Sequence, residues 1–280
     1  MKITFLGTGV GIPQVGRVQS GLIMEIGGRP VLFDCGCGVL GRIAEAGYGH
    51  TDINTIVLTH LHLDHAGDVL ALLKARWLSG AADSVHIYGP QGTHEWFGKV
   101  MAPYAYLRDR FGVEITELSG GEAFSPDSSG TGAGKGAEDI GNIEGIARGA
   151  TGENAVDDCV ITCTPTVHSV PSLAYRLEIN GRAVVYTGDT EPSELLFRFA
   201  EGAEVLIHEC SFPLGFETTN HTTPDMLTGM MQQHPLDVKH LYLVHLYPQM
   251  QGHEMEAVEH IRGYFTGDVI IGEDLMEIKL

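Results

Sequence analysis

Residues 59–68 read "THLHLDHAGD" and place His60, His62, Asp64 and His65 within six positions. Folding alone gives no reason for this cluster, because His and Asp are mediocre helix formers and a charged side chain in a core is costly. Metal binding does give a reason, since imidazole nitrogens and carboxylate oxygens are common metal ligands. The stretch therefore predicts a metal site whose remaining ligands lie elsewhere in the chain.

Three further candidate ligands follow apolar, strand-like runs. They are His168 in "TPTVHSVPS", Asp189 in "VVYTGDT" and His245 in "LYLVHLYP", and His60 itself follows the run "TIVLT". Residues at the ends of strands in a packed sheet meet at one edge, where loops hold a site on a rigid scaffold. We therefore expect these side chains to converge with the cluster at residues 60–65.

The complete set suits two zinc ions. It divides into His60, His62 and His168 for one ion, Asp64, His65 and His245 for the other, and Asp189 as a bridge between them. Two ions ~3.5–4 Å apart acidify a water that they share to a pKa of around 7, so that it becomes a nucleophile at neutral pH. Mixed His and Asp ligands also suit manganese or iron.

The pattern along the chain predicts two β-rich halves in a single domain, residues 1–280. A β-meander and a helix at 66–77 come first, and further strands and a helix at 224–233 follow, with "DVIIGEDLMEIKL" as a closing hairpin. Residues 119–158 are rich in Gly, Ser and acidic residues, which predicts a flexible insertion. It separates "VEITEL" from "CVITCTPTVH", so we expect it at the tip of an expanded hairpin.

Composition limits the function. The net charge of −19 (17 basic against 36 acidic residues) makes a large nucleic-acid substrate unfavourable, because binders of phosphate backbones present basic surfaces. Five cysteines do not form a disulfide framework, and no apolar run is long enough to cross a bilayer. The N-terminus enters a strand without a signal-peptide pattern, so we expect a cytoplasmic protein without membrane contact.

The motif HxHxDH, with the isolated His, "GDT" and His downstream, resembles the metallo-β-lactamase superfamily over nearly the whole chain. "FLGTGVGIP", "LFDCGCG", "YGPQGT", "HECSF" and "EDLMEIKL" are similar to its ribonuclease Z branch. The resemblance implies an α/β fold, a four-layered αβ/βα sandwich of two similar halves, and a homodimer. It also implies the ligand roles given above.

The same resemblance implies roles for residues near the metals. Asp64 is a candidate proton carrier as well as a ligand, and Asp34 in "LFDCG" orients metal ligands from outside the coordination sphere. His221 in "HTT" corresponds to a histidine that protonates the leaving oxygen, and Glu209 corresponds to the glutamate that holds it.

Two departures from the ribonuclease Z pattern favour a small substrate. That branch carries a long arm for transfer RNA between the third metal His and the bridging Asp, whereas His168 and Asp189 are only 21 positions apart. After the last metal His the branch has Ser and Arg near the phosphate, whereas this chain has "HLYPQM". Tyr247 and Gln249 in that stretch are candidate substrate contacts.

The sequence thus predicts a dinuclear metallo-hydrolase that cleaves a phosphodiester in a small or cyclic molecule. The alternatives are a ribonuclease Z-type endonuclease for transfer RNA 3′ processing, an aryl sulfatase or lactonase, and a non-catalytic metal-binding module. A di-iron oxidoreductase is disfavoured, because that branch of the superfamily has Glu where this chain has His62.

Overall fold

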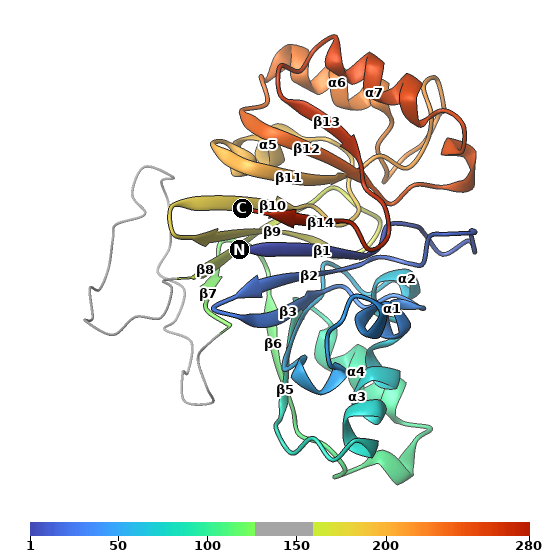
Figure 1. Ribbon diagram of the computed structural model, residues 1–280, viewed down its shortest axis with the longest axis vertical. Coiled ribbons are helices and arrows are strands. Elements are labelled where there is room, and N and C mark those ends of the chain that lie inside the picture. The colour runs from blue at the N-terminus through green and yellow to red at the C-terminus, as the bar shows by residue number, and fades with distance from the viewer. Residues whose placement is uncertain (127–158) are drawn as a thin grey trace.

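A computed structural model describes residues 1–126 and 159–280 of the chain. Two seven-stranded sheets pack face to face, and helices cover the outer face of each (Figure 1). This is the four-layered αβ/βα sandwich predicted from the sequence.

The first sheet has the strand order β14-β1-β2-β3-β4-β5-β6. Strands β14, β1, β2 and β3 pair antiparallel, and β3 to β6 pair parallel. The bounds are β1 Lys2–Gly7, β2 Gly21–Ile26, β3 Arg29–Phe33, β4 Thr55–Val57, β5 Val85–Pro90, β6 Val113–Leu118 and β14 Glu277–Lys279.

The second sheet repeats this plan with the order β13-β12-β11-β10-β9-β8-β7. Strands β7 to β10 pair antiparallel, and β10 to β13 pair parallel. The bounds are β7 Ala123–Phe124, β8 Val160–Pro165, β9 Leu173–Ile179, β10 Arg182–Tyr186, β11 Ala203–Glu209, β12 Val238–Val244 and β13 Asp268–Ile271.

Helices α1 to α4 accompany the first sheet and α5 to α7 the second (Figure 1). Their bounds are α1 Val39–Glu45, α2 Leu63–Ala66, α3 Val69–Leu78, α4 Thr93–Met101, α5 Glu194–Ala200, α6 Pro224–Gln233 and α7 Glu254–Arg262, with 3₁₀ turns η1 His50–Asp52, η2 Ala105–Leu107 and η3 Pro248–Met250. None of the helices described in residues 1–126 and 159–280 is long and apolar enough to span a membrane.

Both faces of each sheet are buried, which explains the continuous apolar runs of the central strands. In β3, Phe33 faces the core between the sheets while the neighbouring Leu32 faces the helices. Tyr175 of the opposite sheet packs edge-on against Phe33 with ring centroids 6.1 Å apart, and its hydroxyl donates to the Leu58 carbonyl at 2.8 Å. This contact ties the two sheets together directly beneath the predicted metal cluster.

The predicted closing hairpin is wrong. The closing segment does not fold back on itself, because β13 pairs with β12 in the second sheet and β14 pairs with β1 in the first. Asp274 in the crossing accepts hydrogen bonds from the backbone N–H groups of Thr8 and Val18, at 2.9 and 2.8 Å, and so fixes this path. Local sequence pattern does not reveal such long-range contacts.

The expectation that the insertion lies at a hairpin tip is confirmed in part, because β7 before it and β8 after it pair antiparallel in the second sheet. The segment "VEITEL" is not a strand of that hairpin but β6, at the edge of the first sheet. The predicted helix at 66–77 also begins later, because Gly67 and Asp68 separate α2 from α3. The prediction that residues 119–158 are flexible falls mainly on 127–158, which lie outside the described residues.

Candidate metal centre

The structure brings the seven predicted ligands together at one edge of the sandwich. His60 and His62 lie in the turn after β4, and α2 carries Asp64 and His65. The other three follow strands of the second sheet, as predicted: His168 follows β8, Asp189 follows β10 and His245 follows β12.

The first ligand group contains three histidines, and His62 lies between the other two. Its Nδ1 lies 3.1 Å from Nε2 of His60 and 3.2 Å from Nε2 of His168. Asp189 completes the group, with Oδ2 3.7 Å from Nε2 of His60 and 4.0 Å from Nε2 of His168. Four ligand atoms thus surround one point, which is the number that zinc commonly takes.

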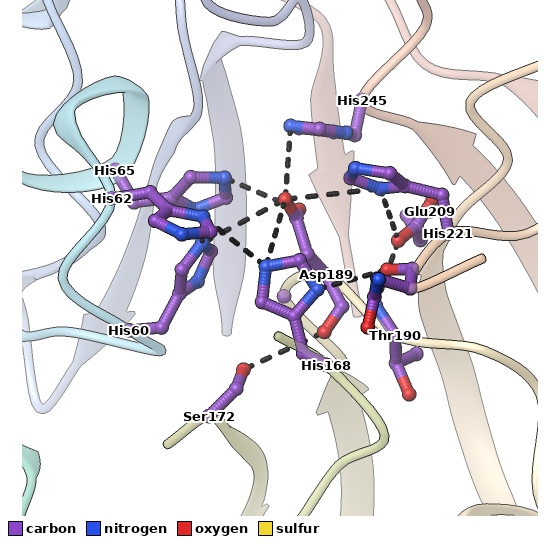
Figure 2. A network of polar contacts seen from close by, with 12 residues as sticks. His60, His62, His65, His168, Ser172, Asp189, Thr190, Glu209, His221 and His245 are labelled. Carbon is purple, nitrogen blue, oxygen red and sulfur yellow. Dashed lines mark hydrogen bonds and ion pairs between the residues drawn. The ribbon is translucent and has the colours of Figure 1, made fainter. Parts of the chain in front are cut away.

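The second group is Asp64, His65 and His245, and Asp189 of the first group lies beside it (Figure 2). Nε2 of His65 lies 3.2 Å from Asp189 Oδ1, and Nε2 of His245 lies 3.3 Å from Asp189 Oδ2. Nε2 of His245 is also 3.6 Å from Oδ2 of Asp64. Figure 2 shows Asp189 between His60, His62 and His65 on one side and His221 on the other. Asp189 thus lies between the two predicted ligand groups, where the sequence predicts a bridging carboxylate.

Three buried atoms at the centre of this arrangement support a cation there. Nε2 of His65, Nε2 of His245 and Oδ1 of Asp189 make no hydrogen bond within the described parts of the chain. Nε2 of His65 and Oδ1 of Asp189 are 3.2 Å apart, which is an ion-pair distance without a hydrogen bond between them. Buried polar atoms are nearly always satisfied, and a metal ion would satisfy all three here. The donor set, imidazole nitrogen and carboxylate oxygen, fits zinc.

Burial of His60 favours its neutral, metal-binding form, whereas at His65 the burial that lowers the pKa is outweighed by the charges and hydrogen bonds of Asp189 and Asp34, so the pKa of His65 is raised. Burial lowers the pKa of His60 well below its ordinary value, and the neighbouring His65 lowers it further, despite the opposing charge of Asp189. A neutral imidazole keeps a lone pair for a metal, whereas a protonated one has none.

Asp34 holds His65 from behind, as the resemblance implied. Its Oδ2 lies 2.7 Å from Nδ1 of His65 and accepts from the Tyr186 hydroxyl at 2.8 Å, and its Oδ1 accepts from the Thr59 N–H at 2.8 Å. The carboxylate is fully buried, and the backbone φ of 55° lies in the left-handed region, where a non-glycine residue is strained. By accepting at Nδ1, Asp34 directs Nε2 of His65 towards Asp189.

Three other histidines are oriented by groups that the sequence did not single out. Thr59 Oγ1 lies 3.0 Å from Nδ1 of His60, and Ser211 Oγ lies 3.0 Å from Nδ1 of His245. His168 Nδ1 donates to the backbone carbonyl of Asn220 at 2.8 Å. Thr59 stands in the opening motif and Ser211 in "HECSF", so both had a sequence signal. No sequence pattern indicates the contact with the Asn220 carbonyl, because any residue has a carbonyl and its position depends on the conformation of the loop.

The glycine of "TGDT" is Gly188, and it lies where the neighbouring Thr59 leaves no room for a side chain. A Cβ atom there would lie 2.6 Å from Cβ of Thr59, and its φ is 56°. Only glycine allows the chain to pass this close to the first sheet in a left-handed conformation. The close passage is what places Asp189 among ligands from the other half of the molecule.

His221 and Glu209 form a pair beside the metal ligands. His221 Nδ1 lies 3.0 Å from Glu209 Oε1 and 4.0 Å from Asp189 Oδ2. Glu209 is fully buried, and its two oxygens also accept from Thr190 N–H at 2.7 Å, Ser211 O–H at 2.6 Å and Thr222 N–H at 3.1 Å. These three hydrogen bonds fix the orientation of the Glu209 carboxylate, so that Oε1 faces the imidazole of His221.

The surroundings of His221 favour its protonated form. Burial lowers the pKa of His221, but the hydrogen bond to Glu209 and the charges of Glu209, Asp189 and Asp64 outweigh burial, so the pKa is raised. His221, Asp189 and His245 are also close enough to form a third potential ligand group. The hydrogen bond to Glu209 occupies Nδ1, which makes a proton-carrying role the better explanation of the pair.

Of the two predicted substrate contacts, Tyr247 packs against the predicted ligand His245, whereas Gln249 is exposed at the surface. The ring of Tyr247 stands edge-on to His221 and His245, with centroids 5.6 and 5.8 Å away, and burial raises the pKa of its hydroxyl to about 12. It therefore remains a neutral hydrogen-bond donor. Gln249 is exposed on η3.

Comparisons with known proteins agree with this geometry. Residues 29–246 match the family model described as the β-lactamase superfamily domain. The chain belongs to the metallo-β-lactamase superfamily. Within it, a ribonuclease Z of Methanosarcina mazei is 26% identical over 333 residues, covering 100% of this chain and 98% of that protein. One from Mycobacterium avium is 33% identical over 213 residues, covering 74% of this chain and 69% of that protein.

Solved structures show the same fold. The metallo-β-lactamase fold protein YhfI from Bacillus subtilis has a TM-score of 0.77 at 21% identity, covering 99% of this chain and 98% of that one. The short form of human tRNase Z has a TM-score of 0.72 at 21% identity, covering 100% and 99%. A diphosphatase of the PhnP family has a TM-score of 0.68 at 18% identity, covering 100% and 97%. The chain is thus a ribonuclease Z-like member of a family of metallo-hydrolases.

Proposed function

We propose that this protein is a phosphodiesterase with a dinuclear metal site, acting on a small or cyclic phosphodiester. The observation that carries the proposal is the position of Asp189. It lies within ion-pair distance of His60 in the first ligand group and of His65 and His245 in the second, and 4.0 Å from a histidine held by a buried glutamate. Two sites for ions beside one proton donor suit displacement at phosphorus, where charge develops on oxygens and an alkoxide leaves.

Two ions held by these residues would supply an acidified water as nucleophile and would neutralise charge on the phosphoryl oxygens. Side chains of the protein carry out the proton transfers. Attack by the water oxygen forms one P–O bond and breaks the bond to the leaving oxygen, which takes a proton from His221. Because Nδ1 of His221 faces Glu209, Nε2 is the atom that holds this proton. Asp64 would take the proton that the water loses.

The connection between His168 and Asp189 favours a small substrate over transfer RNA. Residues 168–189, all of them described, form β9, a two-residue turn at Asn180 and Gly181, and β10. Both turn residues have positive φ, 52° and 75°, as a tight hairpin requires. The connection therefore has no arm. The net charge of −19 adds repulsion towards a polyanion.

Endonucleolytic processing of transfer RNA is the second candidate function. The similarity to proteins named ribonuclease Z, at up to full coverage of this chain, favours it. The homodimer, the cytoplasmic location and the identity of the metals stay predictions from the sequence.

Hydrolysis of bis(p-nitrophenyl) phosphate by protein reconstituted with zinc or manganese tests the proposal, with Asp189→Ala as the control. We expect turnover that the variant loses. A precursor transfer RNA with a 3′ extension, assayed in parallel, distinguishes the two candidates, because only a ribonuclease Z cuts it at the 3′ end of the mature sequence. Absence of turnover despite two bound metals contradicts the proposal and favours a sulfate ester, a lactone or a binding role.

A further inference from the structure

Three aromatic rings form a continuous stack beside the candidate metal centre. Phe212 is the middle ring, 4.3 Å from Phe216 with an interplanar angle of 3°, and 4.4 Å from Tyr247 with an angle of 29°. Phe212 is buried, whereas Tyr247 is half-buried and Phe216 is 40% exposed. The stack therefore runs from the metal site towards solvent and ends in an open ring.

The stack lies beside His221, the proposed proton donor to the leaving oxygen. His221 stands edge-on to two of its rings, 5.6 Å from Tyr247 and 6.1 Å from Phe212. The leaving oxygen must approach His221 to receive its proton, so the group attached to that oxygen lies next to these rings. Phe216 is one ring further from His221 than Phe212 is.

Phe216 is held in place although its ring is exposed. Its backbone N–H donates to the Pro213 carbonyl at 3.2 Å, which closes a turn. The N–H of Gly215 in that turn donates to Asp225 Oδ2 at 2.7 Å, which anchors the turn to the first residues of α6. An exposed ring fixed in parallel alignment needs little further ordering to stack on a ligand, and such preorganisation favours binding.

We propose that the stack of Phe216, Phe212 and Tyr247 binds an aromatic ring on the leaving-oxygen side of the substrate. The inference rests on the proposed phosphodiesterase function and specifies its substrate. The ring is either an aryl group esterified to the phosphate or a nucleobase carried by a sugar, since each presents a flat π face to Phe216.

Binding of matched anions to the metal-loaded protein, measured by titration calorimetry, tests this inference without requiring turnover. One pair is benzylphosphonate and cyclohexylmethylphosphonate, and the other is uridine 3′-phosphate and ribose 3-phosphate. Within each pair the anionic group is the same, so the ratio of the Kd values isolates the aromatic ring. We expect the aromatic member of at least one pair to bind more tightly, by a factor on the order of 5 to 100.

Three variants locate the effect. Phe216→Leu keeps an apolar side chain but removes the π face, and we expect it to make the two Kd values equal. Phe216→Tyr should keep the ratio. So should Tyr264→Leu, the matched control, which removes a 48% exposed ring just beyond α7.

The pair that shows the preference identifies the source of the ring, aryl group or nucleobase. Equal Kd values for both pairs in the wild-type protein overturn the inference, as does a ratio that Phe216→Leu leaves unchanged. Neither result touches the phosphodiesterase proposal, which the hydrolysis assay tests separately.

Discussion

Replacement of His221 by alanine should slow the hydrolysis of diesters with poor leaving groups and spare those with good ones. His221 contacts Asp189 only at 4.0 Å, whereas its Nδ1 is 3.0 Å from Glu209. The variant therefore loses a proton donor and keeps all seven predicted ligands. An alkoxide needs a proton as it leaves, but p-nitrophenolate is stable without one.

The size of the effect follows from how well the donor is positioned. Glu209 is fully buried and accepts from three donors besides His221, so the imidazole is held before substrate binds. General acid catalysis by a positioned side chain contributes about 10²–10⁴-fold. We expect a loss of kcat in this range, roughly 3–5 kcal/mol in activation free energy, for an alkyl leaving group.

The assay compares kcat for a methyl p-nitrophenyl diester with kcat for a dialkyl or cyclic diester, in wild-type protein and in His221→Ala, with metal content measured in both. We predict a steep loss only for the alkyl leaving group and unchanged metal content. An equal loss for both substrates would refute the role as acid. A loss of metal would instead identify His221 as a ligand.

Three further predictions concern the groups around the ligands. Glu209→Gln removes the main cause that raises the pKa of His221, so the pH above which alkyl diester hydrolysis declines should move lower; an unmoved pH–rate profile would contradict this. Asp34→Asn should weaken metal affinity by about 10–100-fold in chelator competition, because Nδ1 of His65 loses its charged partner, and wild-type affinity would count against the orienting role. Gly188→Ala should lower the free energy of unfolding by at least ~1 kcal/mol in denaturant titration, because the new Cβ would lie 2.6 Å from Cβ of Thr59 at a φ of 56°; an unchanged midpoint would show that the strands can separate there.

The sequence was sufficient to predict the ligand cluster because the ligands follow apolar strands, and strand ends meet at one edge of a sandwich. The density of His and Asp at residues 60–65 has no folding explanation, which makes that signal strong. The layered fold followed from two β-rich halves and from the family resemblance.

What the sequence did not predict depends on contacts between distant segments. The last strands entered different sheets because Asp274 binds backbone groups near residues 8 and 18, and no local pattern encodes that contact. The stack of Phe216, Phe212 and Tyr247 was missed for the same reason, since Tyr247 comes from a different loop, some thirty residues further along the chain.

The central claim is that Asp189 joins two metal ions in one catalytic site. Elemental analysis of the purified, reconstituted protein, combined with the diesterase assay, tests it most directly. We predict two equivalents of metal per chain in the wild-type protein, and loss of both metal and turnover in Asp189→Ala. A single equivalent in the wild-type protein, or an Asp189→Ala variant with full turnover, would contradict the claim.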